Sequence, residues 1–301
     1  MNWFAHGRPP RWFVGLGNEQ WSQGAHCVEL ALTKLGMVST GWRRSGKIAL
    51  GGAVRNRLDV HVGPLLRDTF HPYPEVWYLA VHRELKFLAE RAPTVLRATT
   101  EEDRLRPLLL PALVPARETL HLPDALVRPW SNEVAAVLCA RAPEGTRQVT
   151  GADVRRLDVD PAVLWTAARH NLRAEPLEEG TAVPKGTDME VNVMGSNDRF
   201  GLSQLLRLGE LLPDAARNGV LVGVIGSPGL FACHEVVRRD QLPKAVRFLE
   251  LMIAREWYDP FRTEFSGVYW WKDGLAETVR TGDGAVKVSS RMMGVLDKLS
   301  R

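Results

Sequence analysis

The feature that most constrains the fold is a repeated change of hydrophobic period in the C-terminal half of the chain. Apolar residues recur there with a period of two, typical of a strand, and then with a period of about 3.6, typical of a helix. The predicted segments are, in order, a strand at Met189, Val191 and Val193, a helix over 200–212, strands over 220–225 and 230–237, and a helix over 241–256. This β-α-β-β-α order predicts an α+β fold, with mixed or antiparallel sheets and packed helices.

The N-terminal half also mixes both periods. Apolar spacing and capping residues predict a helix from Ala25 to Gly36, a hairpin over 47–63, a helix over 74–91, a strand over 133–141, a short helix from the capping box Thr150–Asp153, and a helix over 161–173. Residues 93–129 contain several prolines, which favour short edge strands and loops over helix.

These segments suggest four regions along the chain. They are a Trp/Arg/Pro-rich arm over 1–24, an N-terminal α+β region over 25–148, a C-terminal α+β region over 149–256, and an aromatic-rich C-terminal extension over 257–301.

Composition narrows the class of protein. No run approaches the roughly 18 to 20 apolar residues that cross a bilayer, and no secretory signal precedes the first helix, so we expect a cytoplasmic protein without membrane partners. The three cysteines, Cys27, Cys139 and Cys233, are far apart, which fits neither a disulfide framework nor a zinc knuckle. The 39 Lys and Arg residues are interspersed with 35 Asp and Glu, so we do not expect nucleic acid as the partner.

Three short segments contain residue types that occur in catalytic motifs. Gly15 and Gly17 lack the third glycine and the strand-to-helix unit of a dinucleotide site. Cys233-His234-Glu235 is chemically suggestive, but neighbouring side chains on a strand point to opposite faces, which favours a core cysteine beside a surface histidine. Ser227 lies in a Gly-Ser-Pro-Gly turn, which lacks the spacing of a serine-hydrolase elbow. We therefore assign no catalytic residue.

The potential metal ligands have simpler structural interpretations. His61, His71 and His82 lack the spacing of a shared ligand face and are predicted to be scattered surface residues. Acceptor groups gather at Asp188, Glu190, Asn192, Asn197 and Asp198, where Asn197-Asp198 is better explained as a helix cap. His170-Asn171-Leu172-Arg173 suits a helix C-terminus. The sequence predicts no metal site and no cofactor.

Aromatic and arginine residues provide the candidate binding surface. The chain has ten tryptophans, and Trp and Arg are favoured at contact surfaces, although Trp is equally useful in a core. The candidate binding residues are Trp3, Trp12 and Trp21 in the N-terminal arm and Arg262, Tyr269, Trp270 and Trp271 near the C-terminus. Those that are exposed are expected to contact another protein.

Three stretches are similar to the YtpQ-like family of uncharacterised bacterial proteins. They are the run Arg106-Pro-Leu-Leu-Leu-Pro-Ala-Leu-Val-Pro115, the helix from Pro161 that ends in Asn171-Leu172-Arg173, and the segment from Glu190 to Val237. The resemblance covers roughly residues 25–256, is clearest over 104–237, and rests on the order of apolar residues. It implies a cytoplasmic α+β protein, and because the family has no established activity, it assigns no catalytic residues.

Three functions from different classes remain open on these grounds. The leading hypothesis is a non-enzymatic, cytoplasmic protein-interaction protein of immunity or adaptor type that binds its partner through the Trp/Arg-rich terminal segments. The second is an enzyme whose site is assembled from distant residues such as Asp198, His234 and Glu235. The third is a nucleic-acid-binding protein that uses the small basic excess.

Overall fold

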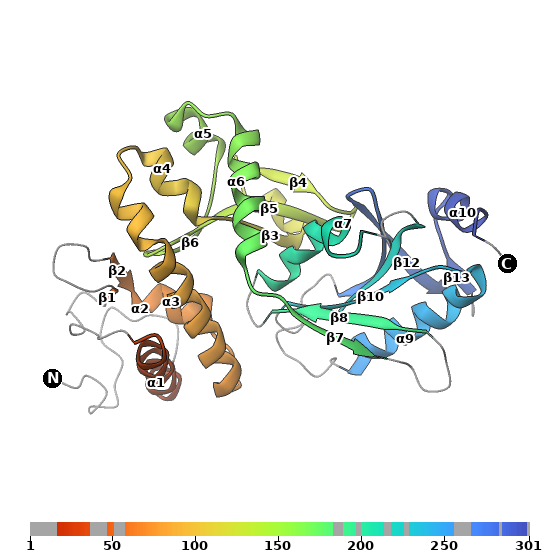
Figure 1. The fold of residues 1–301 in the computed structure, drawn as a ribbon, viewed down its shortest axis with the longest axis horizontal. Helices are drawn as coiled ribbons and strands as arrows, with labels where there is room; N and C mark the ends of the chain where they lie inside the picture. The colour runs from red at the N-terminus through yellow and green to blue at the C-terminus, as the bar shows by residue number, and fades with distance from the viewer. Residues whose placement is uncertain are drawn as a thin grey trace. The chain divides into compact units, whose positions relative to one another are not determined.

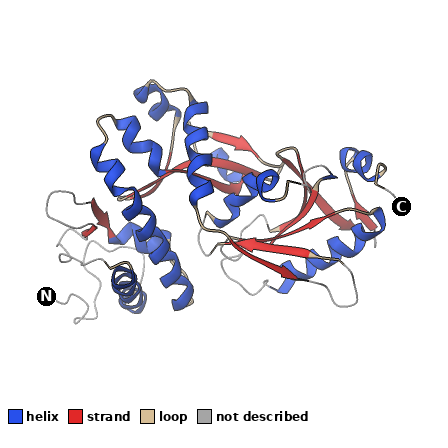
Figure 2. Cartoon of the chain, in the orientation of Figure 1, coloured by secondary structure: helices blue, strands red, loops and turns tan. Residues whose placement is uncertain are grey.

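A computed structural model gives the fold and describes residues 17–36, 47–50, 58–182, 189–196, 200–213, 218–225, 229–255, 266–282 and 285–299. The chain divides into two compact units (Figure 1). Unit 1 comprises Met1–Leu110 and Leu138–Asn171, and unit 2 comprises Pro111–Val137 and Leu172–Arg301. Helices and antiparallel strands occur in both units, which confirms the predicted α+β class (Figure 2).

Unit 1 is built mainly from helices. Its elements are α1 (Asn18–Lys34), β1 (Lys47–Leu50), β2 (Leu58–His61), α2 (Val62–Asp68), α3 (Pro74–Arg97), α4 (Glu101–Leu105), the 3₁₀ turn η2 (Arg106–Leu108), β6 (Gly145–Gln148), α5 (Gly151–Leu157) and most of α6 (Pro161–Ala174). The predicted hairpin is confirmed, because β1 and β2 pair antiparallel. The predicted capping box of α5 is also present, with Thr150 and Asp153 each bonded to the other's backbone amide.

Helices α1 and α3 pack closely because one residue at their contact has no side chain. A Cβ placed on Gly24 of α1 would lie 2.6 Å from the indole ring of Trp77 of α3. Such a distance is shorter than van der Waals contact, so only glycine fits there. Trp77 is fully buried against this surface.

Helix α1 begins at Asn18, seven residues before the predicted start, so the predicted arm over 1–24 is wrong for its last residues. The Gln20 side chain accepts a hydrogen bond of 2.8 Å from the Gly17 amide and stabilises this earlier start. Trp21 then continues the buried face of the helix. Residues 1–16 of the arm lie outside the described part of the chain.

Helix α3 extends further than its sequence pattern indicated. It begins at Pro74 as predicted, but it continues through Pro93 to Arg97. A proline inside a helix removes a single backbone donor, and packing of the buried face can offset that loss. Leu88 and Ala92 supply buried side chains next to Pro93.

A four-stranded sheet carries the long strand β5 (Val134–Ala142), every residue of which is buried. β5 lies between β3 (Leu109–Pro115) and β4 (Val127–Pro129), and its later residues pair with β6. The predicted central strand over 133–141 is therefore confirmed. The boundary between the two units falls inside both β3 and β5.

Unit 2 is built around a seven-stranded sheet. Its strands are β7 (Glu178–Ala182), β8 (Val191–Gly195), β9 (Val220–Val224), β10 (Leu230–Glu235), β11 (Gly267–Lys272), β12 (Leu275–Gly282) and β13 (Ala285–Lys287). They are ordered β13-β12-β11-β9-β10-β8-β7, with antiparallel neighbours. The remaining elements are η3 (Ala116–His121), η4 (Gly201–Arg207), α7 (Leu208–Leu211), η5 (Arg239–Gln241), α9 (Leu242–Arg255) and α10 (Ser290–Leu296). The predicted β-α-β-β-α order is confirmed by β8, η4 with α7, β9, β10 and α9.

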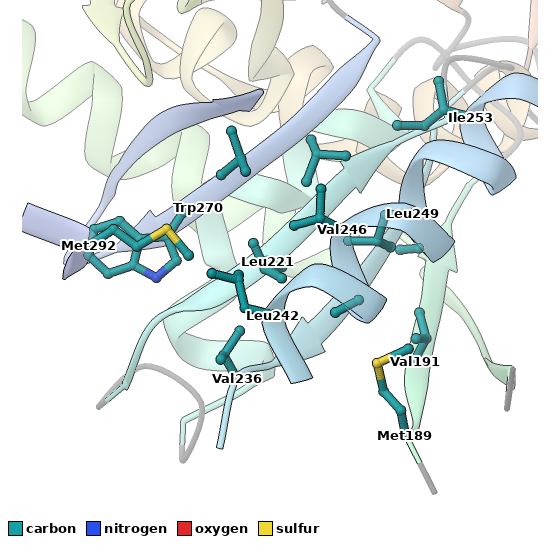
Figure 3. Close-up of a cluster of buried hydrophobic side chains, with 14 of the residues drawn as sticks. Met189, Val191, Leu221, Val236, Leu242, Val246, Leu249, Ile253, Trp270 and Met292 are labelled. Atoms are coloured by element: carbon teal, nitrogen blue, oxygen red, sulfur yellow. The ribbon is translucent and has the colours of Figure 1, made fainter. Parts of the chain in front are cut away.

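Helix α9 covers one face of this sheet (Figure 1). Its buried side chains include Val246 and Leu249, which lie over Leu221 of β9 in the hydrophobic cluster of Figure 3. Trp270 and Met292 extend the same cluster towards α10. Burial of such side chains contributes about 1.5–3 kcal/mol each, which is enough to fix α9 on the sheet.

Strands β11 and β12 form a tight hairpin through Asp273 and Gly274. Both residues have positive φ angles, 52° and 82°, as in the turns that suit the twist of a two-residue hairpin. On its other side β11 pairs with β9, so it is an inner strand of the sheet. The predicted C-terminal extension over 257–301 is wrong as a separate region, because β11, β12 and β13 belong to the main sheet of unit 2.

Gly219, just before β9, is required by its surroundings. Its φ angle is +82°, and a Cβ at this position would lie 2.3 Å from Nε1 of Trp270.

Among the helices that the structure describes, none is both long and apolar enough to cross a membrane.

Candidate functional site

A concavity described in unit 2 lies along β12. It is a groove of about 920 Å³, called the β12 groove below, and it is lined by the turn between β4 and β5, by residues of β12 and by the start of α10. These three segments are distant in sequence and are brought together by the fold of unit 2.

The first wall is a turn held by its own hydrogen bonds. The Ser131 hydroxyl accepts hydrogen bonds of 3.1 and 3.0 Å from the amides of Glu133 and Val134. The amides of Trp130 and Ser131 donate in return to the Val134 carbonyl. The exposed side chains of Asn132 and Glu133 are thus presented by a fixed backbone.

Two contacts join this turn to β12, which forms the second wall. The Ala276 amide donates a hydrogen bond of 2.7 Å to the Trp130 carbonyl. Four residues along, Arg280 Nη2 lies 2.7 Å from Glu133 Oε1 in an ion pair. The two walls are therefore connected at two points, and Thr278 of β12 lies between those points in sequence.

The start of α10 closes the third side. Ser289 caps the helix by accepting a hydrogen bond of 3.1 Å from the Met292 amide. Arg291 donates to the Lys272 carbonyl at 2.9 Å and to Glu277 Oε1 at 3.3 Å, and its guanidinium lies 5.4 Å from the centre of the Trp270 ring. These contacts fasten α10 to the β11–β12 hairpin.

The charges of the groove balance. Its lining contains two carboxylates, Glu133 and Glu277, and two guanidinium groups, Arg280 and Arg291, and each carboxylate is paired with one arginine. Oε2 of Glu277 is a buried acceptor to which the described residues supply no hydrogen bond. On β11, opposite Thr278, burial and then the charge of Glu133 raise the pKa of Tyr269, so this phenol stays protonated at neutral pH.

The aromatic residues predicted to bind a partner take core positions wherever the structure describes them. Trp21, Tyr269, Trp270 and Trp271 are all buried, which corrects their assignment to an exposed binding surface. The physical reason is that both faces of β11 are covered. Trp270 faces the α9 cluster, whereas Tyr269 stacks edge-on against Trp130 with ring centres 5.2 Å apart. The other candidates, Trp3, Trp12 and Arg262, lie outside the described residues.

The Cys233-His234-Glu235 triplet does not assemble a reactive site. Cys233 is fully buried, and burial raises its pKa. His234 was predicted to be a surface residue, but it is 4% exposed, because β10 is an inner strand of the sheet. Its Nδ1 lies 2.8 Å from the Glu190 carbonyl, and burial lowers its pKa despite that hydrogen bond. Asp198, the third member of the proposed distant site, lies outside the described residues.

The remaining motifs have structural roles or fall outside the described chain. His71 is buried, contrary to its prediction as a surface histidine, and its Nδ1 accepts a hydrogen bond of 3.2 Å from the Tyr73 amide. Asn171 near the end of α6 donates to the carbonyls of Arg106 and Leu109, which agrees with the structural role predicted for that helix end. Within the described ranges, no three His, Cys, Asp or Glu side chains are arranged to hold a metal ion. Asp188, Asn197 and Ser227 lie outside these ranges.

Sequence reasoning did not identify the groove residues. Ser131, Asn132, Glu133, Thr278 and Arg280 form no motif, and Glu133 and Arg280 are 147 residues apart. One available signal was the Asp273-Gly274 pair between apolar segments, which is typical of a tight hairpin and would have located β11 and β12.

Comparison with known proteins identified no relative of this chain. The chain matches no protein-family model, no curated protein and no solved structure at a significant level.

Proposed function

We propose that this chain is a non-enzymatic protein-interaction protein that binds a partner polypeptide in the β12 groove. The observation that carries the proposal is the pair of contacts that join the groove's walls, Ala276 to Trp130 and Arg280 to Glu133. A groove whose walls are already fixed loses little conformational entropy when it is filled, which favours binding.

The pairing of charges in the groove supports binding over acid–base chemistry. Glu133 is held by Arg280 and Glu277 by Arg291, so both carboxylates of the lining are already engaged in ion pairs. A general acid or base needs its carboxyl oxygens within hydrogen-bond reach of the proton that it transfers. The balanced lining also supports a protein partner over a nucleic acid, which would favour an excess of arginine and lysine.

We further propose a cytoplasmic location and an adaptor or immunity role, as expected for a protein whose function is to hold another protein. A relationship to the YtpQ-like family is part of the proposal and is supported by the order of apolar residues over 104–237. A solved structure from that family with a different strand order would argue against the relationship.

Site-specific photo-crosslinking tests the groove as the binding surface. A photoreactive amino acid replaces Asn132, which is exposed at the tip of the groove's turn, in the full-length protein expressed in its native cells. Leu251, exposed on α9 and outside the groove lining, is the matched control position. We expect a discrete protein adduct from position 132 and none from position 251. Adducts from position 251 alone, or from neither position, would contradict the proposal.

A further inference from the structure

The outer edge of β12 is only partly occupied by other strands. β12 pairs with β11 along Leu275 to Val279, whereas β13 pairs with β12 only from Arg280 to Gly282. The outer edge of β12 therefore has no described partner strand beside its first residues, and this is the stretch that lines the groove.

The register decides which main-chain groups point outwards from this edge. In an antiparallel pair, the amide and carbonyl of alternate residues face the neighbouring strand, and those of the residues between face away from it. Leu275 and Lys272 flank the two-residue turn, so the groups of Leu275, Glu277 and Val279 face β11. Those of Ala276, Thr278 and Arg280 face the outer edge.

Contacts of the two flanking residues agree with this alternation. The Ala276 amide bonds outwards to the Trp130 carbonyl, and Arg280 is paired outwards with Lys287 of β13. Between them, the amide and carbonyl of Thr278 face the groove, and no described strand is paired with them. A donor and an acceptor spaced as in a strand are thus presented inside a concave site.

We propose that the partner binds as an extended segment that adds a short strand to β12 at Thr278. This inference rests on the proposed function and specifies how the same groove is filled. Strand addition is a recurrent mode of peptide recognition, in which main-chain hydrogen bonds provide affinity and neighbouring side chains provide specificity. The Thr278 amide and carbonyl bond the main chain of the partner segment.

The lining specifies the chemistry of that segment. Because the two carboxylates and two guanidinium groups of the groove neutralise each other, a charged segment would gain no net attraction. The exposed Asn132 side chain offers an amide, which can both donate and accept hydrogen bonds. The occupant is therefore an uncharged segment whose serine, threonine, asparagine or glutamine side chains bond that amide.

Strand β7, at the end of the sheet opposite β13, is less suited to this role. β7 presents Glu178 and Glu179 on an exposed surface. Charged side chains on an edge strand are a common protection against unwanted pairing. The edge of β12 lies instead between two walls that limit what can reach it.

The first test uses a displayed library of short random linear peptides as the probe, selected on the full-length protein. Thr278→Pro removes the outward amide, and because that amide faces away from β11, the pairing with β11 is retained. Thr278→Val is the matched control, since it alters the side chain and keeps the amide. We expect selected peptides to be uncharged and rich in hydroxyl or amide side chains. Thr278→Pro should weaken their binding at least about tenfold and Thr278→Val less than about twofold.

The second test alters the peptide, so that a folding defect in the protein cannot produce the result. Each amide of a selected peptide is methylated in turn, which removes one donor at a time. Strand addition predicts that only alternate positions are sensitive, with a loss of at least about tenfold at the residue that bonds the Thr278 carbonyl. Equal tolerance at every position would overturn strand addition.

A blocking variant separates failure of this inference from failure of the proposed function. Asn132→Trp fills the tip of the groove, with Leu251→Trp as its control on α9. Peptides that are blocked by Asn132→Trp but insensitive to Thr278→Pro and to methylation would refute strand addition and leave the groove as the binding site. Peptides unaffected by Asn132→Trp, or a library without binders, would overturn both.

Discussion

Two glutamate–arginine pairs, one in each unit, have the same separation and very different surroundings. In unit 1, Arg141 Nε lies 2.7 Å from Glu84 Oε2, and in unit 2, Arg280 Nη2 lies 2.7 Å from Glu133 Oε1. The side chains of the first pair are 1% and 13% exposed, whereas those of the second are 72% and 42% exposed. The distance is the same, so solvent exposure determines how much each pair stabilises the fold.

The unit 1 pair is embedded in packed side chains. The Arg141 guanidinium lies 4.4 Å from the centre of the Phe87 ring, and Arg141 belongs to the fully buried strand β5. The Nε–Oε2 contact is short but is not aligned as a hydrogen bond. Because water reaches the Arg141 charge so little, the folded state depends on a counter-ion to stabilise that charge. The exposed Arg280 is instead solvated with or without Glu133.

The largest expected effect comes from removing the anion of the buried pair. Glu84→Gln leaves the buried Arg141 charge without this carboxylate and should lower the free energy of unfolding by about 3–5 kcal/mol. Urea titration followed by circular dichroism measures the change.

A second glutamate on the same helix provides the control for that variant. Glu90 of α3 lies 3.8 Å from Lys86, with both side chains 57% exposed, so Glu90→Gln should change stability by less than about 0.5 kcal/mol. Similar losses in the two variants would remove the distinction between buried and exposed pairs on which the comparison rests.

The side chain of Asp153 is about as buried as that of Glu84, but its partners Arg147 and Arg156 are partly exposed, so its removal should have a smaller effect, which depends on pH. Burial alone would raise its pKa, but hydrogen bonds from the Thr150 amide, Arg147 and Arg156 outweigh burial and lower the pKa to about 2. In the unfolded chain the carboxyl titrates near its ordinary pKa of about 4. Between these values the unfolded state binds more protons, so the stabilisation is present above pH 4 and is lost as pH falls towards 2.

Asp153→Asn measures this contribution directly. The variant should be less stable than the wild type by about 1–2 kcal/mol at pH 7, and the difference should shrink as pH falls from about 4 to 2. Paired urea titrations across that range provide the comparison. A difference that stays constant with pH would mean that the charge of Asp153 contributes nothing and that only its shape matters.

The sequence predicted the fold most successfully where aliphatic residues form a regular period or a short continuous run. The β-α-β-β-α order was readable because β8, α9 and their neighbours keep a clear apolar period. It failed for β11 because its run of aromatic residues, Tyr269, Trp270 and Trp271, resembled a binding patch and was not interpreted as a strand. The start of α1 was missed because its capping bond uses Gln20 and a glycine, without the usual Ser, Thr or Asp at the cap.

Sequence patterns could not predict the candidate site, for a different reason. The groove is defined by where the turn at Ser131 meets β12, and its central feature is the main chain of Thr278. Main-chain groups are the same for every residue, so no residue pattern indicates which of them lack a partner. Only the pairing of β12 with β11 and with β13 reveals that position.

The smallest expected change in stability comes from the exposed pair of unit 2, and it completes the comparison. Glu133→Gln should alter the free energy of unfolding by less than about 0.5 kcal/mol, because both side chains remain solvated and the bond between the Ala276 amide and the Trp130 carbonyl still joins the walls. The same urea titration used for Glu84→Gln measures this change. A loss above about 1.5 kcal/mol would show that the pair holds the turn against β12, in which case solvent exposure does not set the stabilisation of the two pairs.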